Sequence, residues 1–299
     1  MEVSTHDNLS IVDLSYLKGR LKVKGEDNLN LLDRLTTNNL TYLTKLGDGL
    51  SSVLTTNKGR IIDLLEIYFF QDYLFLINDL NAVSKVSEWI DFYTIMEDVE
   101  LLDVTEETFQ IRIISHNIHE IYNKVDLIEP SHFVMDLLFN KNLMLIKNSM
   151  AGLPYLDIIG DIKDFSVIFD ELKQLGTSID VDEYEKLRVS IGYPKYGNEY
   201  TEEFNPLEAQ LIEHISFNKG CYIGQEVVAR LNTYNKVQRT LVKLRSDKQL
   251  QLGDLRYDGK KVGIITSVYS HQGIGYVKNI YSKPGVELSY DDYTVQVYE

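Results

Sequence analysis

The sequence predicts an α+β region that is followed by a small all-β domain, with the boundary near residue 235. Three observations lead to this prediction. Before the boundary, segments with the period of a strand occur among segments with the period of a helix. After it, short strand-like segments follow one another and are separated by glycine-containing turns. With 299 residues, of which 44% are hydrophobic, the chain is long enough for two or three domains with cores of their own.

In the first hundred residues, the pattern predicts strands and two helices. The strands are expected at residues 20–23, 51–55, 61–70 and 73–77, and a turn at residues 57–60 joins the second to the third. Asn28 can cap a helix over residues 29–35, in which Leu32 lies on the apolar side. Asn78 or Asp79 can cap a second helix that runs to about residue 93.

The middle of the chain combines predicted strands with three predicted helices. Strand-like segments occur at residues 109–114 and 143–146. A helix over residues 165–175 has Asp164 at its start and Gly176 after its end. Further helices are expected over residues 183–191, ended by Gly192, and over residues 206–214, with Pro206 in the first turn.

Beyond residue 238, the segments with strand character are short and closely spaced. They cover residues 239–244, 262–267, 275–279 and 293–298. Strands of this spacing are typical of a small antiparallel barrel or sandwich. We therefore predict two units, residues 1–235 and residues 236–299, of which the second is an antiparallel β-barrel.

The charge of the chain disfavours nucleic acid and anionic membranes as partners. There are 30 Lys and Arg residues against 45 Asp and Glu residues, so the formal net charge is −15. Affinity for a phosphate backbone comes mainly from basic side chains, and an anionic membrane surface attracts the same groups. We expect neither nonspecific nucleic-acid binding nor membrane binding, whereas a local basic site for one small anion remains compatible with the composition.

Three further features bear on location and on metal binding. The longest apolar stretch, residues 61–77, is interrupted by acidic residues, which excludes a spanning helix. The first seven residues lack the basic and apolar regions of a signal peptide, so we expect a cytoplasmic protein. Cys221 is the only cysteine, and no acidic or cysteine cluster completes a metal site around His116 and His119, so no disulfide and no metal site are expected.

The most unusual segment is N-K-G-C-Y-I-G-Q-E-V-V-A-R, residues 218–230, in which Cys221 lies between two glycines. Glycines four residues apart indicate a backbone that approaches another group closely or adopts a positive φ. Lys219 is near enough in sequence to favour the thiolate and make it reactive. The alternative is that Cys221 is a small buried hydrophobic residue, and residue chemistry alone favours this alternative.

A second candidate is Arg188 together with the segment G-Y-P-K-Y-G-N-E, residues 192–199. It combines a helix end with a glycine-rich turn, two tyrosines and the carboxylate of Glu199. A carboxylate in such a turn can pair with a planar donor pair such as that of a pterin, and tyrosine rings supply a stacking surface. The alternative is a surface glutamate on a loop, which composition alone favours.

A third candidate is Asp63, which interrupts the apolar run of residues 61–65 just after the turn at residues 57–60. If the strand is buried on both faces, this carboxylate needs a partner or a function. If one face is solvated, Asp63 is the polar position of an alternating strand. The sequence favours neither alternative.

Residues 219–226, K-G-C-Y-I-G-Q-E, match the signature K-G-C-Y-x-G-Q-E of the YgfZ-type folate-binding proteins, which are relatives of the aminomethyltransferase (T-protein) of the glycine cleavage system. The matching residues are Lys219, Gly220, Cys221, Tyr222, Gly224, Gln225 and Glu226. Residues 21–25 resemble the opening strand of the family, residues 54–63 its glycine hairpin, and residues 261–267 the start of its C-terminal barrel. The resemblance covers nearly the whole chain, and it favours a functional role for Cys221 and Glu199 over the alternatives above.

The resemblance implies a three-lobed cloverleaf fold, an α+β architecture of the aminomethyltransferase type. Two interleaved α+β lobes and a C-terminal β-barrel would surround a central cavity that holds tetrahydrofolate or a one-carbon derivative. By this resemblance, Glu199 would pair with the pterin ring and Asp63 would lie near the reactive nitrogens of the folate. Tyr196 and Arg188 would lie near or behind the pocket. The anionic tail of folate needs a cation, for which Arg230 is the candidate.

One departure from the aminomethyltransferases bears on the reaction. Their hairpin has two glycines followed by two aspartates, where this chain has Gly59-Arg60 and Asp63-Leu64, so one carboxylate for proton handling is absent. The cysteine signature, which the transferases lack, favours the branch of the family that acts in the assembly or repair of iron–sulfur clusters, including those of enzymes that thiolate tRNA.

Three functions are compatible with this resemblance. The first is a folate-dependent accessory protein for iron–sulfur proteins or their assembly machinery, without classical enzyme turnover, in which Cys221, activated by Lys219, acts on a partner. The second is a one-carbon (aminomethyl) transferase that uses Asp63. The third is a docking module whose folate pocket has decayed.

Overall fold

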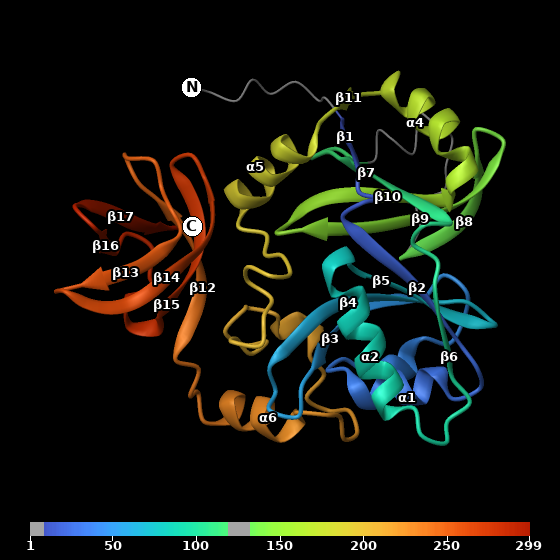
Figure 1. Ribbon diagram of the computed structural model, residues 1–299, viewed down its shortest axis with the longest axis horizontal. Helices are drawn as coiled ribbons and strands as arrows, with labels where there is room; N and C mark the ends of the chain where they lie inside the picture. Colours follow the sequence, from blue (N-terminus) through green and yellow to red (C-terminus); the bar gives the residue numbers. More distant parts are fainter. Residues whose placement is uncertain (1–8, 119–131) are drawn as a thin grey trace.

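The computed structural model of the chain describes residues 9–118 and 132–299. These residues form an α+β fold with two open sheets and one closed barrel, which Figure 1 shows as three lobes. No helix in the described part of the chain is long and apolar enough to cross a membrane.

The first lobe is a five-stranded sheet with the strand order β3-β4-β5-β2-β6. Its strands are β2 (Lys18–Lys24), β3 (Gly49–Thr55), β4 (Ile61–Phe69), β5 (Tyr73–Asp79) and β6 (Glu100–Asp103). It carries the helices α1 (Asn28–Leu35), α2 (Val83–Tyr93) and the 3-10 helices η1 (Leu40–Tyr42) and η2 (Leu80–Ala82). Leucine, valine and isoleucine side chains from the sheet and from both α-helices form one buried cluster, which fixes the helices on the sheet.

The second lobe is a six-stranded sheet with the order β11-β1-β7-β10-β9-β8. Its elements are β1 (Ser10–Asp13), β7 (Thr108–Ile114), β8 (Phe133–Leu138), β9 (Lys141–Met150), β10 (Leu153–Asp161), η3 (Ile162–Asp164), α4 (Phe165–Lys173), β11 (Thr177–Ser178) and α5 (Val181–Ile191). Strand β1 precedes the first lobe in the sequence, yet it pairs with β7 and β11 of the second. The two α+β lobes are therefore interleaved, as predicted.

The third lobe is a closed barrel with the strand order β12-β15-β14-β13-β16-β17. Its elements are β12 (Arg239–Arg245), β13 (Gly253–Tyr257), β14 (Lys260–Tyr269), β15 (Gln272–Lys278), η5 (Asn279–Tyr281), β16 (Glu287–Tyr290) and β17 (Tyr293–Tyr298). The sequence analysis missed β13 and β16, because each is only five or four residues long and has one buried residue. Without them the predicted strands could not close a barrel.

Two predicted helix features differ in the structure. Residues 206–214 form no α-helix, because Gln210 has a φ of 59° and Asn205 accepts hydrogen bonds from the backbone of Leu207 and Glu208 in a turn; only η4 (Ile212–His214) remains. Asn28 is the first residue of α1, and Asp27 occupies the N-cap position. The side-chain amide of Asn28 donates to the carbonyl of Val23 and does not cap the helix.

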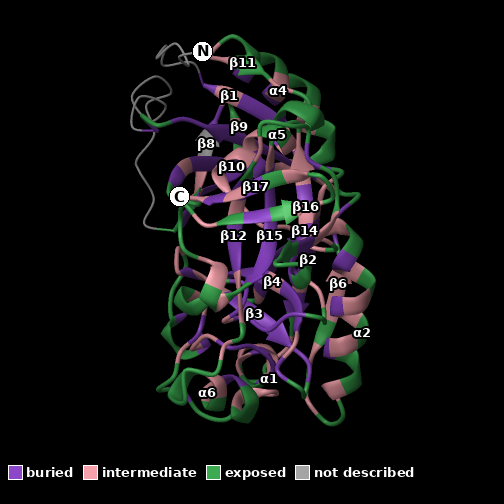
Figure 2. Ribbon diagram, turned by 90° about the vertical axis from the view of Figure 1, so that its left-hand side faces the viewer, coloured by how far each residue is buried: buried purple, intermediate pink, exposed green. Residues whose placement is uncertain are grey.

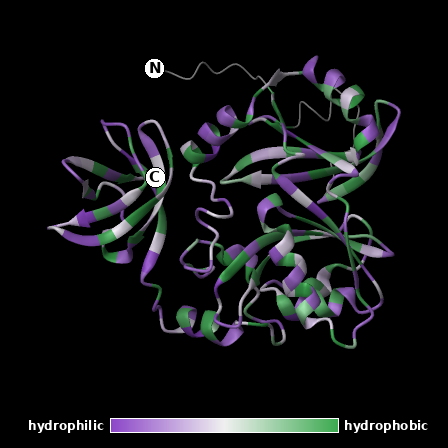
Figure 3. Ribbon diagram, viewed as in Figure 1, coloured by the Kyte–Doolittle hydropathy of each residue, from purple (hydrophilic) through white to green (hydrophobic). Residues whose placement is uncertain are grey.

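Helix α6 (Gln225–Thr233) was not predicted, and it begins inside the cysteine signature. Its residue before the first turn, Gly224, has the left-handed conformation with a φ of 86°. Figure 2 shows that α6 and α2 lie at the surface with mostly exposed outer residues, whereas the strands carry the buried ones. Figure 3 shows hydrophobic and hydrophilic residues mixed along the helices and along the barrel strands, as expected of elements with one buried face.

Two buried clusters join the lobes. Tyr68 and Phe75 of the first sheet pack with Phe133 and Ile146 of the second. A separate cluster brings barrel residues such as Tyr276 together with residues of β3, β4 and α5. Because the three lobes meet through these contacts, the side chains that face one another between them can form a shared site.

Candidate functional site

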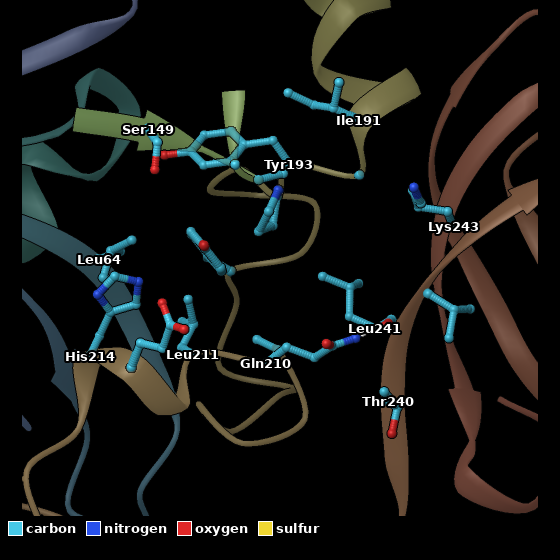
Figure 4. Close-up of a pocket in the computed structure, with 18 of the residues that line it drawn as sticks. Leu64, Ser149, Ile191, Tyr193, Gln210, Leu211, His214, Thr240, Leu241 and Lys243 are labelled. Atoms are coloured by element: carbon cyan, nitrogen blue, oxygen red, sulfur yellow. Dashed lines mark hydrogen bonds between the residues drawn. The ribbon is translucent and has the colours of Figure 1, made fainter. Parts of the chain in front are cut away.

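A hollow of about 610 Å³ lies where the three lobes meet. Figure 4 shows Thr240, Leu241 and Lys243 of the barrel on one side of it, with Leu64 and His214 on the opposite side. This volume lies within the range of roughly 300–1,000 Å³ that is typical of small-molecule pockets. The arrangement therefore provides a central cavity large enough for a cofactor.

A narrower extension of about 120 Å³ continues this hollow between the two α+β lobes. The two spaces share the lining residues Leu64, Glu66, Tyr193, Pro194 and Tyr200. The charged residues that line the extension are Lys18, Asp63, Glu66, Asp79, Glu185, Arg188 and Lys195. Such a dense set of charges beside tyrosine rings suits a polar, planar ligand.

Asp63 lies in this extension, and β4 is buried on both faces around it, which decides between the two alternatives left open by the sequence. Its side chain is 2% exposed and accepts hydrogen bonds from the backbone of Asp79 and Leu64, at 2.9 and 2.8 Å. Burial raises the pKa of Asp63 to about 7, against the lowering effect of these hydrogen bonds and of Lys18. This carboxyl group can therefore exchange a proton near neutral pH.

Lys18 and Glu66 line the same extension and were not identified from the sequence. Burial lowers the pKa of Lys18, but electrostatic attraction to the neighbouring Tyr193 and Glu66 outweighs this effect, so the pKa is raised overall. Glu66 is 6% exposed, and its Oε2 accepts from the hydroxyl of Tyr68 at 2.8 Å. The signal that could have found Glu66 is its position in the apolar stretch that Asp63 also interrupts.

Arg188 lines the extension and is held by Glu185 on the preceding turn of α5. Two hydrogen bonds of 2.9 and 2.6 Å join the guanidinium of Arg188 to both carboxylate oxygens of Glu185, and Lys195 Nζ adds a third contact at 2.8 Å. Burial raises the pKa of Glu185, but these cations outweigh it and hold the pKa at about 2. Glu185 is thus a charged carboxylate that faces the cavity, and its spacing from Arg188 is the helical signal that could have identified it.

Glu199 lies behind Arg188 and does not line either part of the cavity. Its side chain has no exposed surface. Its oxygens accept hydrogen bonds from Arg188 Nη1, the backbone of Lys195 and the hydroxyls of Thr266 and Ser267. The structure therefore differs from the expected pterin contact, because four protein donors already occupy this carboxylate, which connects α5 to the barrel.

Tyr196, which the resemblance placed near or behind a folate pocket, lines the extension together with Tyr184, Tyr193 and Tyr200. Burial raises the pKa of Tyr193 to about 12, so its ring is neutral at ordinary pH. Tyrosine rings in a cavity wall can offer a stacking surface to a planar ligand. The site thus brings together Asp63, Arg188 and Tyr196 from three separate segments.

Arg230 lies on the exposed side of α6 and does not line the central cavity, so the structure differs from its expected role at the tail of folate. The cation that the structure places in the larger hollow is Lys243 on β12. No sequence signal marked Lys243, because it occupies an ordinary polar position of a barrel strand.

Cys221 is exposed, which is contrary to the buried alternative that residue chemistry favoured. Its neighbour Lys219 does not serve as the expected activator. The Nζ of Lys219 binds the carbonyl oxygens at the end of α1, those of Asp33, Thr36 and Asn38, and the carboxylate of Asp33 at 2.9 Å. Because these partners use all its donors, Lys219 fixes the loop on α1.

The rest of the signature is also held by contacts with the first lobe. Thr55 donates its hydroxyl to the carbonyl of Ile223 at 2.6 Å. Gly224 touches the turn of the β3–β4 hairpin so closely that an added Cβ would lie 2.5 Å from the carbonyl oxygen of Thr56 and 2.9 Å from Cα of Gly59. Two glycine-containing motifs that are far apart in the sequence therefore pack against each other, and Cys221 projects from a loop that is anchored on both sides.

The described residues contain no group of three or more His, Cys, Asp or Glu side chains that could hold a metal ion. His119, which the sequence analysis considered with His116, lies outside the described residues.

Comparisons with known proteins agree with this architecture. No family model matches the chain. It is 31% identical to the chloroplastic "putative transferase" of Arabidopsis thaliana over 90% of its own length and 65% of that protein. It is 21% identical to an aminomethyltransferase of Alkaliphilus metalliredigens over 89% of its length and 76% of the relative. An aminomethyltransferase of Thermotoga petrophila is 26% identical over 89% of the chain and 75% of the relative.

A solved structure extends the relationship to the fold. The glycine cleavage system aminomethyltransferase T from Bartonella henselae superposes with a TM-score of 0.84 over 99% of this chain and 86% of that one, at 16% identity. The chain therefore has the fold of this aminomethyltransferase, and the sequence matches support its relationship to the glycine cleavage T-protein, or aminomethyltransferase, family.

Proposed function

We propose that this chain binds tetrahydrofolate, or a one-carbon derivative, in the central cavity and serves as an accessory protein for the assembly or repair of iron–sulfur clusters in certain enzymes, including tRNA-modifying ones. The observation that carries the folate part is the narrow extension, with its carboxylates and tyrosine rings, at the end of a hollow of about 610 Å³. Within the relatives of the T-protein, we assign the chain to the YgfZ-type proteins because of the cysteine signature at residues 219–226.

The lining residues fit the chemical groups of a folate. A pterin offers an amino group and a ring N–H as neighbouring donors, which a carboxylate can accept together. Glu66 suits this role best, because its Oε1 has no hydrogen-bond partner among the described residues and it lines both parts of the cavity. Tyr196 would stack on the ring, Arg188 and Asp63 would border it, and Lys243 would attract the anionic tail.

Binding of tetrahydrofolate can be measured by calorimetry under anaerobic conditions. Replacing Glu66 with glutamine removes the charge from the pterin contact, which should weaken binding by about 1.5–3 kcal/mol, or roughly ten- to a hundredfold. Glu202→Gln is the matched control, because Glu202 lies at the surface in a pair with Lys85. A folded wild-type protein that binds no folate would contradict the proposal and favour a docking module with a decayed pocket.

The iron–sulfur part of the proposal rests on Cys221. An exposed thiol on an anchored loop is accessible to a partner, and one thiolate cannot hold a cluster alone, so the partner must supply the other ligands. We expect Cys221→Ser to fold and to bind folate but to lower the activity of iron–sulfur enzymes in cells that depend on this protein. Asn218→Ser, a change in the same exposed loop, is the control, and full enzyme activity with Cys221→Ser would exclude this role.

A one-carbon transferase is the second candidate function, and the state of Asp63 favours it. A carboxyl group with a pKa of about 7 in the cavity can take up or release a proton during transfer of a one-carbon unit to an amine. Turnover of a methylene- or methyl-folate with a small amine, lost in Asp63→Asn, would identify this function. Absence of turnover together with folate binding would leave the accessory role.

A further inference from the structure

A second hollow, a groove of about 750 Å³, lies between the turn of the β3–β4 hairpin, helix α6 and the start of the barrel. Five cationic side chains line it, those of Lys58, Arg60, Lys236, Arg239 and Lys278. Glu208 is the one acidic residue among the described residues of its lining. In a chain of net charge −15, this is a local reversal of charge.

The two arginines of the groove are held in place by shared partners. Arg239 Nε lies 3.1 Å from the carboxylate of Glu208, and Arg60 Nη1 lies 3.7 Å from the same carboxylate. Both guanidinium groups also donate to the carbonyl oxygen of Glu203, at 2.9 and 3.1 Å. Since one carboxylate compensates two guanidinium groups whose side chains are 40% and 34% exposed, the pair keeps a net positive charge toward the groove.

The three lysines of the groove are available to a ligand. Lys58, Lys236 and Lys278 are exposed, and their ammonium groups make no hydrogen bond or ion pair with the described parts of the chain. The Nζ of Lys236 lies over the ring of Tyr234, 5.5 Å from the ring centroid. Three unpaired ammonium groups around two fixed guanidinium groups form a site for a flexible molecule with several anionic groups.

The groove adjoins the central cavity along two segments of the chain. Arg239 lines the groove and the next residue, Thr240, lines the cavity. Glu208 lines the groove and Gln210, two residues later, lines the cavity. The side-chain amide of Gln210 donates a hydrogen bond to the carbonyl of Leu241, which also lines the cavity. These two segments form a thin wall between the spaces, so a ligand tail long enough to cross this wall from the cavity would reach the cations of the groove.

We infer that this groove binds the oligo-γ-glutamyl tail of a folate whose pterin occupies the central cavity. The inference rests on the folate binding proposed above, and it names polyglutamylated folates as the form that the chain prefers. Each added γ-glutamyl unit carries one carboxylate, so a longer tail offers the groove more anionic groups. Exposed ion pairs contribute little individually, and only several of them together produce a large preference.

The test compares tetrahydrofolate monoglutamate, tetrahydrofolate pentaglutamate and the free penta-γ-glutamate peptide by calorimetry. We expect wild-type protein to bind the pentaglutamate about tenfold more tightly than the monoglutamate, with a preference that decreases as salt is added. The triple variant Lys58→Gln/Lys236→Gln/Lys278→Gln should bind both folates equally and keep the affinity of wild type for the monoglutamate. The free peptide should bind wild type and not this variant.

A variant with the same total charge separates the groove from a general charge effect. Lys24→Gln/Lys173→Gln/Lys260→Gln removes three exposed lysines elsewhere and should keep the preference for the pentaglutamate. Equal affinity of wild type for the two folates would overturn the inference while leaving folate binding intact. If neither folate binds, the proposed function fails. If the free peptide then still binds through the three lysines, the groove is an oligocarboxylate site for another ligand, and the assignment to the folate tail is overturned as well.

Discussion

Replacing Glu199 with glutamine tests whether this carboxylate connects α5 to the barrel. In the structure it accepts hydrogen bonds from Arg188 Nη1 at 3.3 Å, from the backbone of Lys195 at 3.1 Å and from Ser267 at 2.7 Å, and it has no exposed surface. Glutamine keeps the shape of the side chain but removes its charge. It also replaces one acceptor oxygen by an N–H₂ group, which would face protein groups that donate to Glu199. The variant should therefore lose stability and should not lose a contact with folate.

The expected loss follows from the burial of the pair. Removing one partner of a buried ion pair costs about 3–5 kcal/mol. Arg188 keeps its two hydrogen bonds to Glu185, so we expect the lower limit, about 3 kcal/mol. With an unfolding entropy of about 2.1 cal/mol/K per residue over 299 residues, this corresponds to a decrease in Tm of about 5 °C if the chain unfolds cooperatively.

Urea and thermal unfolding followed by circular dichroism measure this loss. Glu202→Gln is again the matched control, because its salt bridge with Lys85 has side chains that are 51% and 40% exposed and should contribute less than about 1 kcal/mol. A Glu199→Gln variant as stable as the control would refute the reasoning. A large loss of folate affinity at unchanged stability would instead return Glu199 to the pterin site.

Three further predictions concern the loop anchors and Asp63. Gly224→Ala should cost about 3 kcal/mol in urea unfolding, because of its positive φ and the contact with Thr56, whereas Gly220→Ala, with open space around it, should be nearly neutral. Lys219→Met should cost about 2 kcal/mol in the same assay, since it leaves carbonyl groups at the end of α1 without their donor. Because the pKa of Asp63 is raised to about 7 in the folded chain from 3.8, folding takes up a proton between these values; wild-type stability should fall as pH rises from 4 to 7, and Asp63→Asn should show a smaller fall.

The arrangement of the lobes and part of the site could be predicted from the sequence. Period and turn residues indicate most strands, and the family resemblance implied the interleaving that β1 produces by pairing with β7 and β11. Asp63, Arg188 and Tyr196, which the resemblance singled out, line one cavity, and their roles toward a folate stay predictions. These features follow from local residue patterns and from the order of motifs along the chain, and both can be read from a single sequence.

The features that were missed depend on partners far away in the chain. Lys219 reaches carbonyl groups more than 180 residues before it, so its nearness to Cys221 in sequence said nothing about where its charge lies. Glu199 could not be separated from a ligand-binding carboxylate until Thr266 and Ser267 of the barrel were placed beside it. Helix α6 was not predicted, because it buries only Val228 and begins after Gly224 without a side-chain cap, so the usual sequence signals of a helix start are absent.

The contacts of the cysteine signature divide its residues into two groups. Lys219 and Gly224 satisfy demands of the fold, since one caps α1 and the other fits against the β3–β4 turn. Cys221 is exposed, and it takes part in no disulfide. Because the anchors would hold this loop equally well with serine at position 221, stability cannot explain a requirement for the thiol there. A loss of cellular function in Cys221→Ser with unchanged unfolding would therefore have to come from the chemistry of sulfur.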